Sequence, residues 1–209
     1  MPATHPRILF LAAALALALG AAAVTLLGRV AWDSLVSRTA SPELSVPTST
    51  LVLDRNGALV RPFPVAGGRW RLPVVLADLD PTYLSMLLAC EDRRFQEHGG
   101  VDPRALLRAG VQLLASGRIV SGGSTLTMQL VRLLERRSTR DPGGKLRQIL
   151  QALALERRAD KAAILTAYLT LAPYGSNIEG VRAAALAWLG KEPRRLTPAE
   201  AALLVALPQ

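Results

Sequence analysis

The residues with the greatest chemical potential lie together in one short segment, residues 90–102. It contains two adjacent carboxylates, Glu91 and Asp92, and also His98, which is one of only two histidines in the chain. A carboxylate at the end of an apolar helix can act as a general base, and polar residues on an apolar scaffold are typical of an active-site rim. Taken alone, however, a run of charges is better explained as a solvated helix end without a catalytic role.

A second group of polar residues lies on the helix predicted over residues 124–135. Thr125, Gln129 and Arg132 are spaced i, i+4 and i+7, which places them on one helical stripe. The preceding Gly122-Gly123-Ser124 can expose backbone N–H groups to an anion. This signal is weak by itself, because Gly-Gly-Ser also describes a flexible turn.

Lys145 is a further candidate for anion binding. It lies in the first turn of the helix predicted over residues 145–158, and it shares a stripe with Gln148. A lysine in a first turn opposes the helix dipole, at a cost of roughly a few tenths of a kcal/mol. A bound anion would offset this cost, and a solvated lysine is the alternative.

The elements that position these residues are predicted to be helices. Only 4% of the 209 residues are aromatic, and alanine and leucine dominate the composition. Helix starts are marked by Asp102-Pro103, by Asp160 and by the capping box Thr197-Pro198-Ala199-Glu200. Further helices are expected over residues 81–91, 124–135, 145–158 and from Gly180 to about Leu189. The fold class is therefore mainly α.

Two of these helices have apolar faces whose burial can be predicted. The helix over residues 145–158 is expected to face the core through Leu146, Ile149, Leu150 and Leu153. The helix that begins at Pro103 carries Leu106, Leu107, Val111 and Leu114 on one face, beside the basic residues Arg104, Arg108 and Arg118. This second face fits either core packing or insertion into a membrane interface with anionic headgroups.

The N-terminal part of the chain predicts a membrane anchor and a connector. Residues 8–28 form an uncharged apolar run that matches the ~20 residues needed to cross a bilayer. A cleavable signal peptide is the alternative, although the run is longer than a typical signal core. We interpret residues 1–7 as a cytoplasmic tail, 8–28 as the transmembrane anchor and 29–50 as a polar linker. An Asn56-Gly57 turn then predicts a small β-hairpin over residues 51–60, and prolines 62, 64 and 73 predict irregular chain until about Leu76.

The charge and the cysteine content limit the partners. A net charge of +9 favours nucleic acid, anionic lipid or a phosphorylated substrate. The basic residues are scattered and follow an export anchor, which argues against nucleic acid. Cys90 is the only cysteine, so an internal disulfide is excluded, and with so few histidines a structural zinc site is not expected.

The motifs together resemble the family-51 peptidoglycan glycosyltransferases, the strand-polymerising domains of class A penicillin-binding proteins. The first signature is Glu91-Asp92-Arg93-Arg94-Phe95 with His98-Gly99 and Asp102, and the second is residues 122–132. Residues 144–148, 164–169 with Gly175, and 200–209 take the places of the third, fourth and fifth. Five signatures in order form a much more specific signal than a single motif.

Two positions depart from the family pattern. The third signature normally reads Arg-Lys, two residues, then Glu, and here those places hold Gly144, Lys145 and Gln148. The fourth normally has Asn after Tyr-Leu, where this chain has Thr170. The Gly-Lys…Gln version, with Met128, looks most like the penicillin-binding protein 1C subgroup. That subgroup continues into a transpeptidase domain, so residues 51–209 are interpreted as a C-terminally incomplete glycosyltransferase domain.

The resemblance implies a lysozyme-like helical fold and polymerisation of lipid II into glycan strands, with inversion and release of polyprenyl pyrophosphate. It implies Glu91 as general base, with Arg132 and Lys145, helix amides or a divalent cation (Mg or Mn) stabilising the leaving group. No organic cofactor is expected. Asp92 either orients Glu91 or caps a helix, and Gln148 replaces the second carboxylate. The implied substrate contacts are Phe95, His98, Ser124, Thr125, Gln129, Arg132 and Lys145, with Phe95 and His98 as wall residues.

Three further expectations follow from this interpretation. The implied partners are lipid II, the growing glycan strand and membrane lipids, without nucleic acid. The implied location is the bacterial inner membrane, as a single-pass protein whose catalytic domain is periplasmic. The alternatives are a lysozyme-like glycan hydrolase and a membrane-anchored, non-catalytic binding or scaffold protein.

Overall fold

The fold is described from a computed structural model that covers residues 6–118, 123–135 and 141–208. The chain divides into two compact units, Met1–Ala40 and Ser41–Gln209, each of which is described separately. Helices dominate both units, and this confirms the predicted mainly α fold class.

The first unit is the long helix α1, Pro6–Arg38. It contains all of the predicted anchor, residues 8–28, and continues about three turns into the predicted linker. Within its described side chains, Leu17–Arg38 is long and apolar enough to cross a membrane. The polar linker is therefore shorter than the sequence suggested, because residues 29–38 continue the helix.

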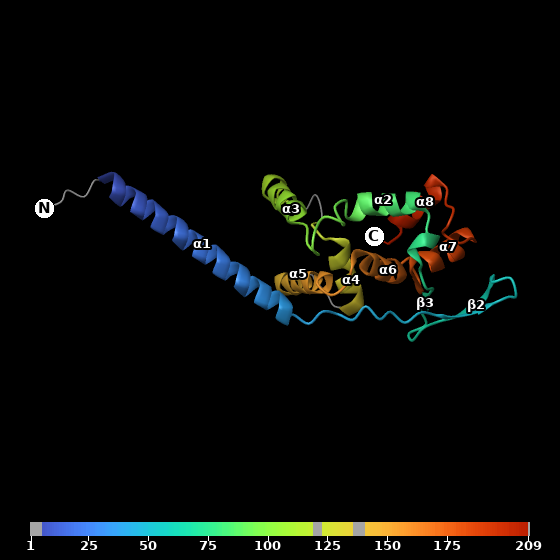
Figure 1. Cartoon of the computed structure of the whole chain (residues 1–209). Helices are drawn as coiled ribbons and strands as arrows, with labels where there is room; N and C mark the ends of the chain where they lie inside the picture. The colour runs from blue at the N-terminus through green and yellow to red at the C-terminus, as the bar shows by residue number, and fades with distance from the viewer. Residues whose placement is uncertain (1–5, 119–122, 136–140, 209) are drawn as a thin grey trace. The chain divides into compact units, whose positions relative to one another are not determined.

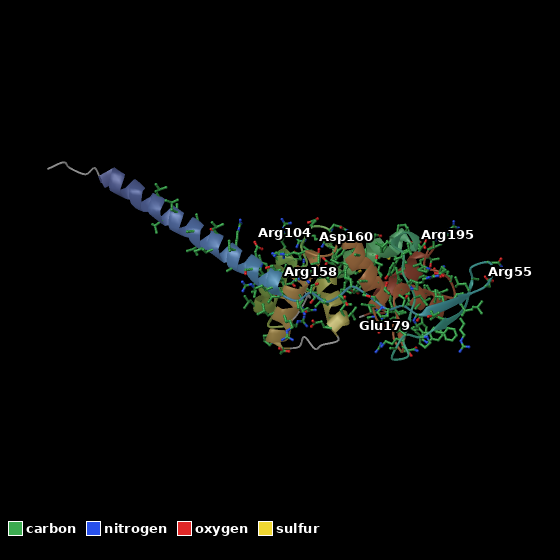
Figure 2. The ribbon with its side chains drawn as sticks, turned by 60° about the horizontal axis from the view of Figure 1, so that its bottom comes forward. Arg55, Arg104, Arg158, Asp160, Glu179 and Arg195 are labelled. Atoms are coloured by element: carbon green, nitrogen blue, oxygen red, sulfur yellow. The ribbon has the colours of Figure 1, made fainter. Side chains whose placement is uncertain are left out.

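The second unit begins with the predicted hairpin. Strands β1 (Thr50–Leu53) and β2 (Leu59–Phe63) pair antiparallel, with Pro62 opposite Leu51. Asp54 Oδ1 accepts hydrogen bonds from the N–H groups of Asn56 and Ala58, and Gly57 has a φ of +81°, which glycine adopts without strain. Arg55 therefore lies at the tip of the hairpin (Figure 2).

The segment from Pro62 to Leu76 is more regular than its prolines predicted. Pro62 lies within β2, and Trp70–Arg71 forms strand β3. β3 pairs in parallel with β4, Ile178–Glu179, so two segments far apart in the sequence lie side by side. The buried Arg71 guanidinium donates to Glu179 and to the Pro47 carbonyl, which ties the start of this unit to its C-terminal half.

The remainder of the second unit is built mainly from short helices (Figure 1). A short 3₁₀ turn, Leu76–Asp78, precedes α2, Pro81–Glu91. The other helices are α3 (Pro103–Ser116), α4 (Leu126–Glu135), α5 (Pro142–Glu156), α6 (Lys161–Leu171), α7 (Val181–Leu189) and α8 (Pro198–Ala206). The predicted caps at Asp160 and at the Thr197 capping box are confirmed.

The core lies where α4 packs against α5 and α6, and where α2 packs against α8. Fully buried side chains from several helices meet there, including Leu87, Phe95, Met128, Ile164 and Leu204. Tyr83 of α2 and Tyr174 join their hydroxyl groups at 2.9 Å inside this core. The catalytic candidates on α2, α4 and α5 therefore share one packed core.

The predicted core face of α5 is only partly correct: Ile149 packs against the core and Leu150 and Leu153 are partly buried, but Leu146 is not. Leu146 is 55% exposed, whereas the buried positions are Gln148, Gln151, Ala152, Ala154 and Leu155. The helix also begins at Pro142, with Asp141 as N-cap, so Lys145 lies beyond the first three helical residues. Its predicted conflict with the helix dipole is correspondingly weaker.

The apolar face of α3 is not part of the core. Leu107, Val111 and Leu114 are 70%, 57% and 88% exposed. Of the two alternatives that the sequence left open, core packing is therefore excluded for these three residues.

Candidate active site

Glu91 is the last residue of α2 and is only partly buried. The helix ends there because the next residue, Asp92, leaves the helical conformation, with φ −158° and ψ 77°. Glu91 Oε2 accepts a hydrogen bond from Gln129 Nε2 at 2.7 Å. The structure thus brings together the first and second groups of candidate residues, from α2 and α4.

Tyr168 extends this contact into α6. Its hydroxyl lies 3.4 Å from Gln129 Oε1, so Gln129 lies between Tyr168 and Glu91. Burial, and then the negative charge of Glu91, raise the pKa of Tyr168 well above its usual range. The phenol therefore stays protonated and donates to Gln129 Oε1. This leaves Gln129 Nε2 to donate to Glu91.

Lys145 supplies a positive charge that has no carboxylate partner in the described structure. Its Nζ donates to Ser124 Oγ at 2.7 Å and to Gln148 Oε1 at 3.0 Å, and both acceptors are neutral. Burial, and then the nearby Arg132 guanidinium, lower the pKa of Lys145. An anion placed beside Ser124 would relieve the repulsion between these two cations.

Gln148 is 3% exposed and bridges two helices. Its Nε2 donates to the Met128 carbonyl of α4, while its Oε1 accepts from Lys145. A carboxylate could not donate the first of these bonds. Gln148 therefore positions Lys145 against α4, and it does so without adding negative charge.

The described residues do not fit a metal site built from protein side chains. No group of three or more His, Cys, Asp or Glu residues is gathered around one point in the ranges that the structure covers. Mg²⁺ and Mn²⁺ favour carboxylate oxygens, and the position that would offer the second carboxylate holds the amide of Gln148. No catalytic step is therefore assigned to a divalent cation.

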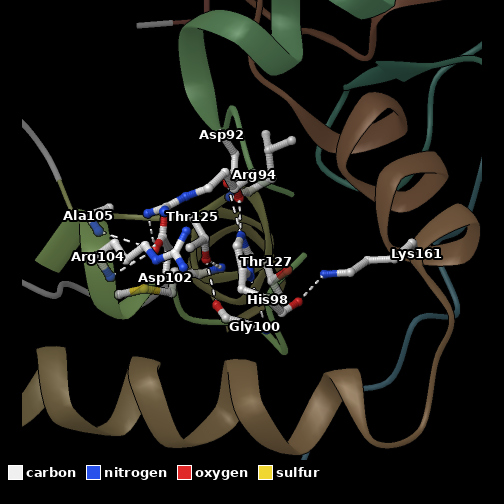
Figure 3. Close-up of polar contacts among 12 residues, drawn as sticks. Asp92, Arg94, His98, Gly100, Asp102, Arg104, Ala105, Thr125, Thr127 and Lys161 are labelled. Carbon is white, nitrogen blue, oxygen red and sulfur yellow. Dashed lines mark hydrogen bonds and ion pairs between the residues drawn. The ribbon is translucent and has the colours of Figure 1, made fainter. Parts of the chain in front are cut away.

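Asp92 has a structural role that the sequence left open. Its carboxylate accepts hydrogen bonds from the Leu126 N–H at 3.0 Å and from His98 Nε2 at 2.9 Å (Figure 3). Asp92 thus lies at the N-terminus of α4, where its charge is favourable. Of the two roles predicted for Asp92, helix capping is the one with contacts in the structure.

Asp92 and Thr125 occupy N–H groups at the start of α4, where an anion site was predicted. Thr125 Oγ1 accepts from the Met128 N–H and donates to the Gly100 carbonyl. Two of the N–H groups that an anion would use are therefore already bonded within the protein. Gly122 lies outside the described residues.

Phe95 is 1% exposed and packs within the hydrophobic core. Thr125 is 2% exposed and caps α4, and it also contributes to the lining of the cavity beside Glu91. The predicted substrate contacts of both residues stay predictions. Lys161 lies over the Phe95 ring, with Nζ 4.4 Å from the ring centroid. It also donates to the His98 carbonyl (Figure 3). His98 is likewise held from inside, by Asp92, and its side chain is 6% exposed.

Two cavities border the candidate residues. One, of about 780 Å³, is lined by Glu91, Ser124, Arg93, Arg104 and Arg108, among others. The other, of about 530 Å³, is lined by Arg132 together with Arg69, Arg71 and Glu179. Glu91 thus lines the first cavity and Arg132 the second, and Gln129, three residues before Arg132 on α4, contacts Glu91.

A comparison with protein families decides the classification. Residues 56–209 match the model of the family described as Transglycosylase. The chain belongs to the transglycosylase family. The match begins a few residues after the predicted domain start at residue 51 and covers all the helices that carry the site.

Individual relatives of this transglycosylase are penicillin-binding proteins. The chain is 46% identical over 168 residues to penicillin-binding protein 1C of Escherichia coli, an alignment covering 80% of this chain and 22% of that protein. It is 36% identical over 167 residues to penicillin-binding protein 1A of Pseudomonas aeruginosa, covering 80% and 20%. The chain thus spans about a fifth of the length of these curated relatives. The higher identity to a 1C protein confirms the subgroup resemblance.

Some residues of the transglycosylase site were missed by the sequence analysis. Tyr168 was placed only within the fourth signature, residues 164–169, although a tyrosine hydroxyl on an apolar helix is a usable signal. Arg94 and Asp102 form a bidentate pair, and Asp102 also caps α3 through the Arg104 and Ala105 N–H groups (Figure 3). Burial opposes ionisation of Asp102, but these hydrogen bonds outweigh it and lower its pKa.

Replacing Asp92 with alanine is expected to destabilise the transglycosylase domain. The Asp92 carboxyl group is 3% exposed, so its removal leaves the Leu126 N–H and His98 without a partner in the interior. The loss is expected to be about 1–3 kcal/mol of unfolding free energy, measured by urea denaturation. Asp92→Asn, which keeps one acceptor oxygen, should lose less. Equal stability of the alanine variant and the wild type would contradict this role.

Proposed function

We propose that this chain polymerises lipid II into peptidoglycan strands. One observation carries the proposal: α4 places Gln129 against the carboxylate of Glu91, and Ser124, just before α4, against the ammonium of Lys145. A partly exposed base and an uncompensated cation are thus held on one scaffold. This is the pair of groups that glycosyl transfer from a pyrophosphate donor needs.

Glu91 acts as the general base in this proposal. Its carboxylate removes the proton from the attacking sugar hydroxyl of one lipid II molecule. The hydroxyl oxygen then bonds to the anomeric carbon of the other molecule, from the face opposite the leaving group, and the configuration inverts. The bond between the anomeric carbon and the phosphate oxygen breaks, and its electron pair leaves with the polyprenyl pyrophosphate. Gln129 orients the base through its 2.7 Å hydrogen bond.

Lys145 and Arg132 stabilise the departing pyrophosphate. It is already a good leaving group, so it needs positive charge rather than a proton donor. Lys145 lies between Ser124 and Gln148, and Arg132 is close enough to lower its pKa. Ser124 and Gln148 provide the orientation, and the two cations provide the charge.

Replacing Gln148 with glutamate tests whether the neutral amide weakens the dependence on a divalent cation. We expect the wild type to turn over with little response to Mg²⁺ or Mn²⁺, and Gln148→Glu to respond more strongly, because a second carboxylate would favour a bound cation. The measurement is the initial rate of polymerisation over a range of cation concentrations. Identical metal profiles for both proteins would defeat the proposal.

The membrane is expected to take part through two separate surfaces. α1 supplies the apolar length for a single span, and we propose that the N-terminus is cytoplasmic and the catalytic unit periplasmic. Leu107, Val111 and Leu114 of α3 are exposed, with Arg104 and Arg108 on the same helix. A face of this composition fits insertion into the interface of an anionic membrane, where the lipid tail of the substrate remains.

Two substrates distinguish glycosyl transfer from the two alternative functions, glycan hydrolysis and non-catalytic binding. Incubation with lipid II alone should give polymer, and incubation with pre-formed glycan strands should leave them intact. Cleavage of the strands into fragments would instead indicate a lysozyme-like hydrolase. Binding of lipid II without any change in either substrate would indicate a scaffold protein.

A further inference from the structure

Gln129 contacts the proposed base with one end of its side-chain amide. Its Nε2 donates to Glu91 Oε2 at 2.7 Å from the first half of α4. The two ends of a glutamine amide have the same shape, but only the nitrogen is a donor. A half-turn of the amide would place its oxygen against the Glu91 carboxylate, where two acceptors repel each other. The orientation of Gln129 therefore decides whether it supports the base or opposes it.

The Tyr168 hydroxyl favours the supporting orientation from the interior. It lies 3.4 Å from Gln129 Oε1, a long hydrogen bond of the kind that shortens in many enzymes once the substrate is bound. In the part of the chain that the structure describes, this hydroxyl has no second acceptor. A flipped amide would thus leave a buried O–H donor without a partner, which is unfavourable.

α6 fixes the Tyr168 ring in place. Tyr168 is 3% exposed and belongs to the hydrophobic core, and the buried Ile164 and Leu169 lie on the same helix. α6 also packs directly against α4, the helix that carries Gln129. Burial, and then the charge of Glu91, raise the pKa of Tyr168, so its hydroxyl keeps its proton. The phenol is therefore a fixed donor rather than a group that can swing or ionise.

We propose that Tyr168 is a positioning residue for glycosyl transfer, acting on Glu91 through the amide of Gln129. The inference rests on the proposed function of Glu91 as the general base. The three side chains come from α6, α4 and α2, so the base is oriented by contacts between three helices. Tyr168 bonds to Gln129 and is not part of the cavity lining beside Glu91. Its hydroxyl should therefore affect the chemical step rather than substrate binding.

The test is a double-mutant cycle in the kcat of lipid II polymerisation. The variants are Tyr168→Phe, which keeps the ring and removes the hydroxyl, Gln129→Leu, which removes the amide, and the combination of both. Tyr168→Phe should lower kcat about 2- to 10-fold, the range for one hydrogen bond, and leave KM unchanged. In the Gln129→Leu background the same change should lower kcat no further.

Two outcomes of the cycle would overturn the inference. An equal loss of kcat in both backgrounds would show that the hydroxyl acts without Gln129. No loss in the wild-type background would show that the hydroxyl does not set the amide. If the wild type itself does not polymerise lipid II, the proposed function fails and the inference fails with it. If the wild type polymerises and Glu91→Gln does not, a failed cycle overturns the inference alone.

Tyr174→Phe is the matched control. It removes another buried phenolic hydroxyl of the same core, whose partner is Tyr83 at 2.9 Å rather than Gln129. It should lower the thermal stability as Tyr168→Phe does, yet keep the wild-type kcat. A loss of kcat equal to that of Tyr168→Phe would assign the effect to core stability and contradict the inference.

A measurement on Gln129 itself does not depend on catalysis. In protein labelled with ¹⁵N at the glutamine side chains, NMR follows the exchange of the Gln129 amide protons with solvent. Exchange should be faster in Tyr168→Phe, because the freed amide can turn away from Glu91, and unchanged in Tyr174→Phe. Exchange as slow in Tyr168→Phe as in the wild type would show that the phenol does not hold the amide.

Discussion

Replacing Glu91 with glutamine is expected to abolish strand synthesis. Glutamine keeps the shape of the side chain and can still accept the hydrogen bond from Gln129, but it cannot take a proton from the attacking hydroxyl. The loss of a general base lowers the rate by about 100- to 10,000-fold. The measurement is the initial rate of lipid II polymerisation, with thermal unfolding as a check that the fold is intact.

A matched control for this variant is Glu97→Gln. Glu97 is an exposed glutamate in the lining of the same cavity and forms no hydrogen bond with Gln129 in the described structure. It should retain nearly all of the activity. A Glu91→Gln protein that matches the wild type would assign the chain to the scaffold alternative, since no base would then be needed.

Replacing Lys145 with glutamine is the second change with a large expected effect. The substitution removes the charge that faces Ser124, where the developing negative charge of the pyrophosphate is expected. Removing one preorganised electrostatic contact of this kind costs about 100- to 1,000-fold in kcat. The neighbouring Arg147→Gln removes a charge from an exposed position on the same helix and should have little effect. Equal losses in both variants would show that only the overall charge matters.

The pH dependence gives an independent test of Lys145. Activity requires the protonated amine, so it is lost as the pH rises through the pKa of Lys145. Burial and Arg132 lower that pKa, so the alkaline limb of kcat/KM should lie at a lower pH than an ordinary lysine would give. Arg132→Gln removes one of the two causes and should move the limb to higher pH. If the alkaline limb of kcat/KM stays at the same pH in that variant, the limb reports the titration of a group other than Lys145.

Helix starts were predictable because they depend on local chemistry. Asp102 and Asp160 accept hydrogen bonds from the first turns of α3 and α6, and Thr197 and Glu200 complete a capping box. Each of these signals involves residues only a few positions apart. The Asn56-Gly57 hairpin was predicted for the same reason.

Helix faces were less predictable, because they depend on what packs against each helix. On α5 the leucine pattern indicated Leu146 as a core residue, yet the buried side includes Gln148 and Gln151. The amide of Gln148 is satisfied by Met128 and Lys145, and Gln151 is satisfied by Glu135. A buried amide with partners from another helix has no signature in the local sequence.

In the candidate site, too, features set by local spacing were predictable and features set by tertiary packing were not. The stripe of Gln129 and Arg132 was readable from helical spacing, and the contact between Gln129 and Glu91 agrees with it. The burial of Phe95 and the hydrogen bond from Thr125 to the Gly100 carbonyl were not readable, because both follow from tertiary packing. Gly100 has a φ of +98°, and an added Cβ would lie 2.6 Å from the Ala152 carbonyl oxygen, so this loop is pressed directly against α5.

The most direct test of the central claim is incubation of the purified chain with lipid II labelled in both its sugars and its lipid. The account predicts glycan polymer, with one polyprenyl pyrophosphate released for each bond formed, and neither product from Glu91→Gln. Lipid II recovered unchanged, or polymer formed equally well by Glu91→Gln, would contradict it.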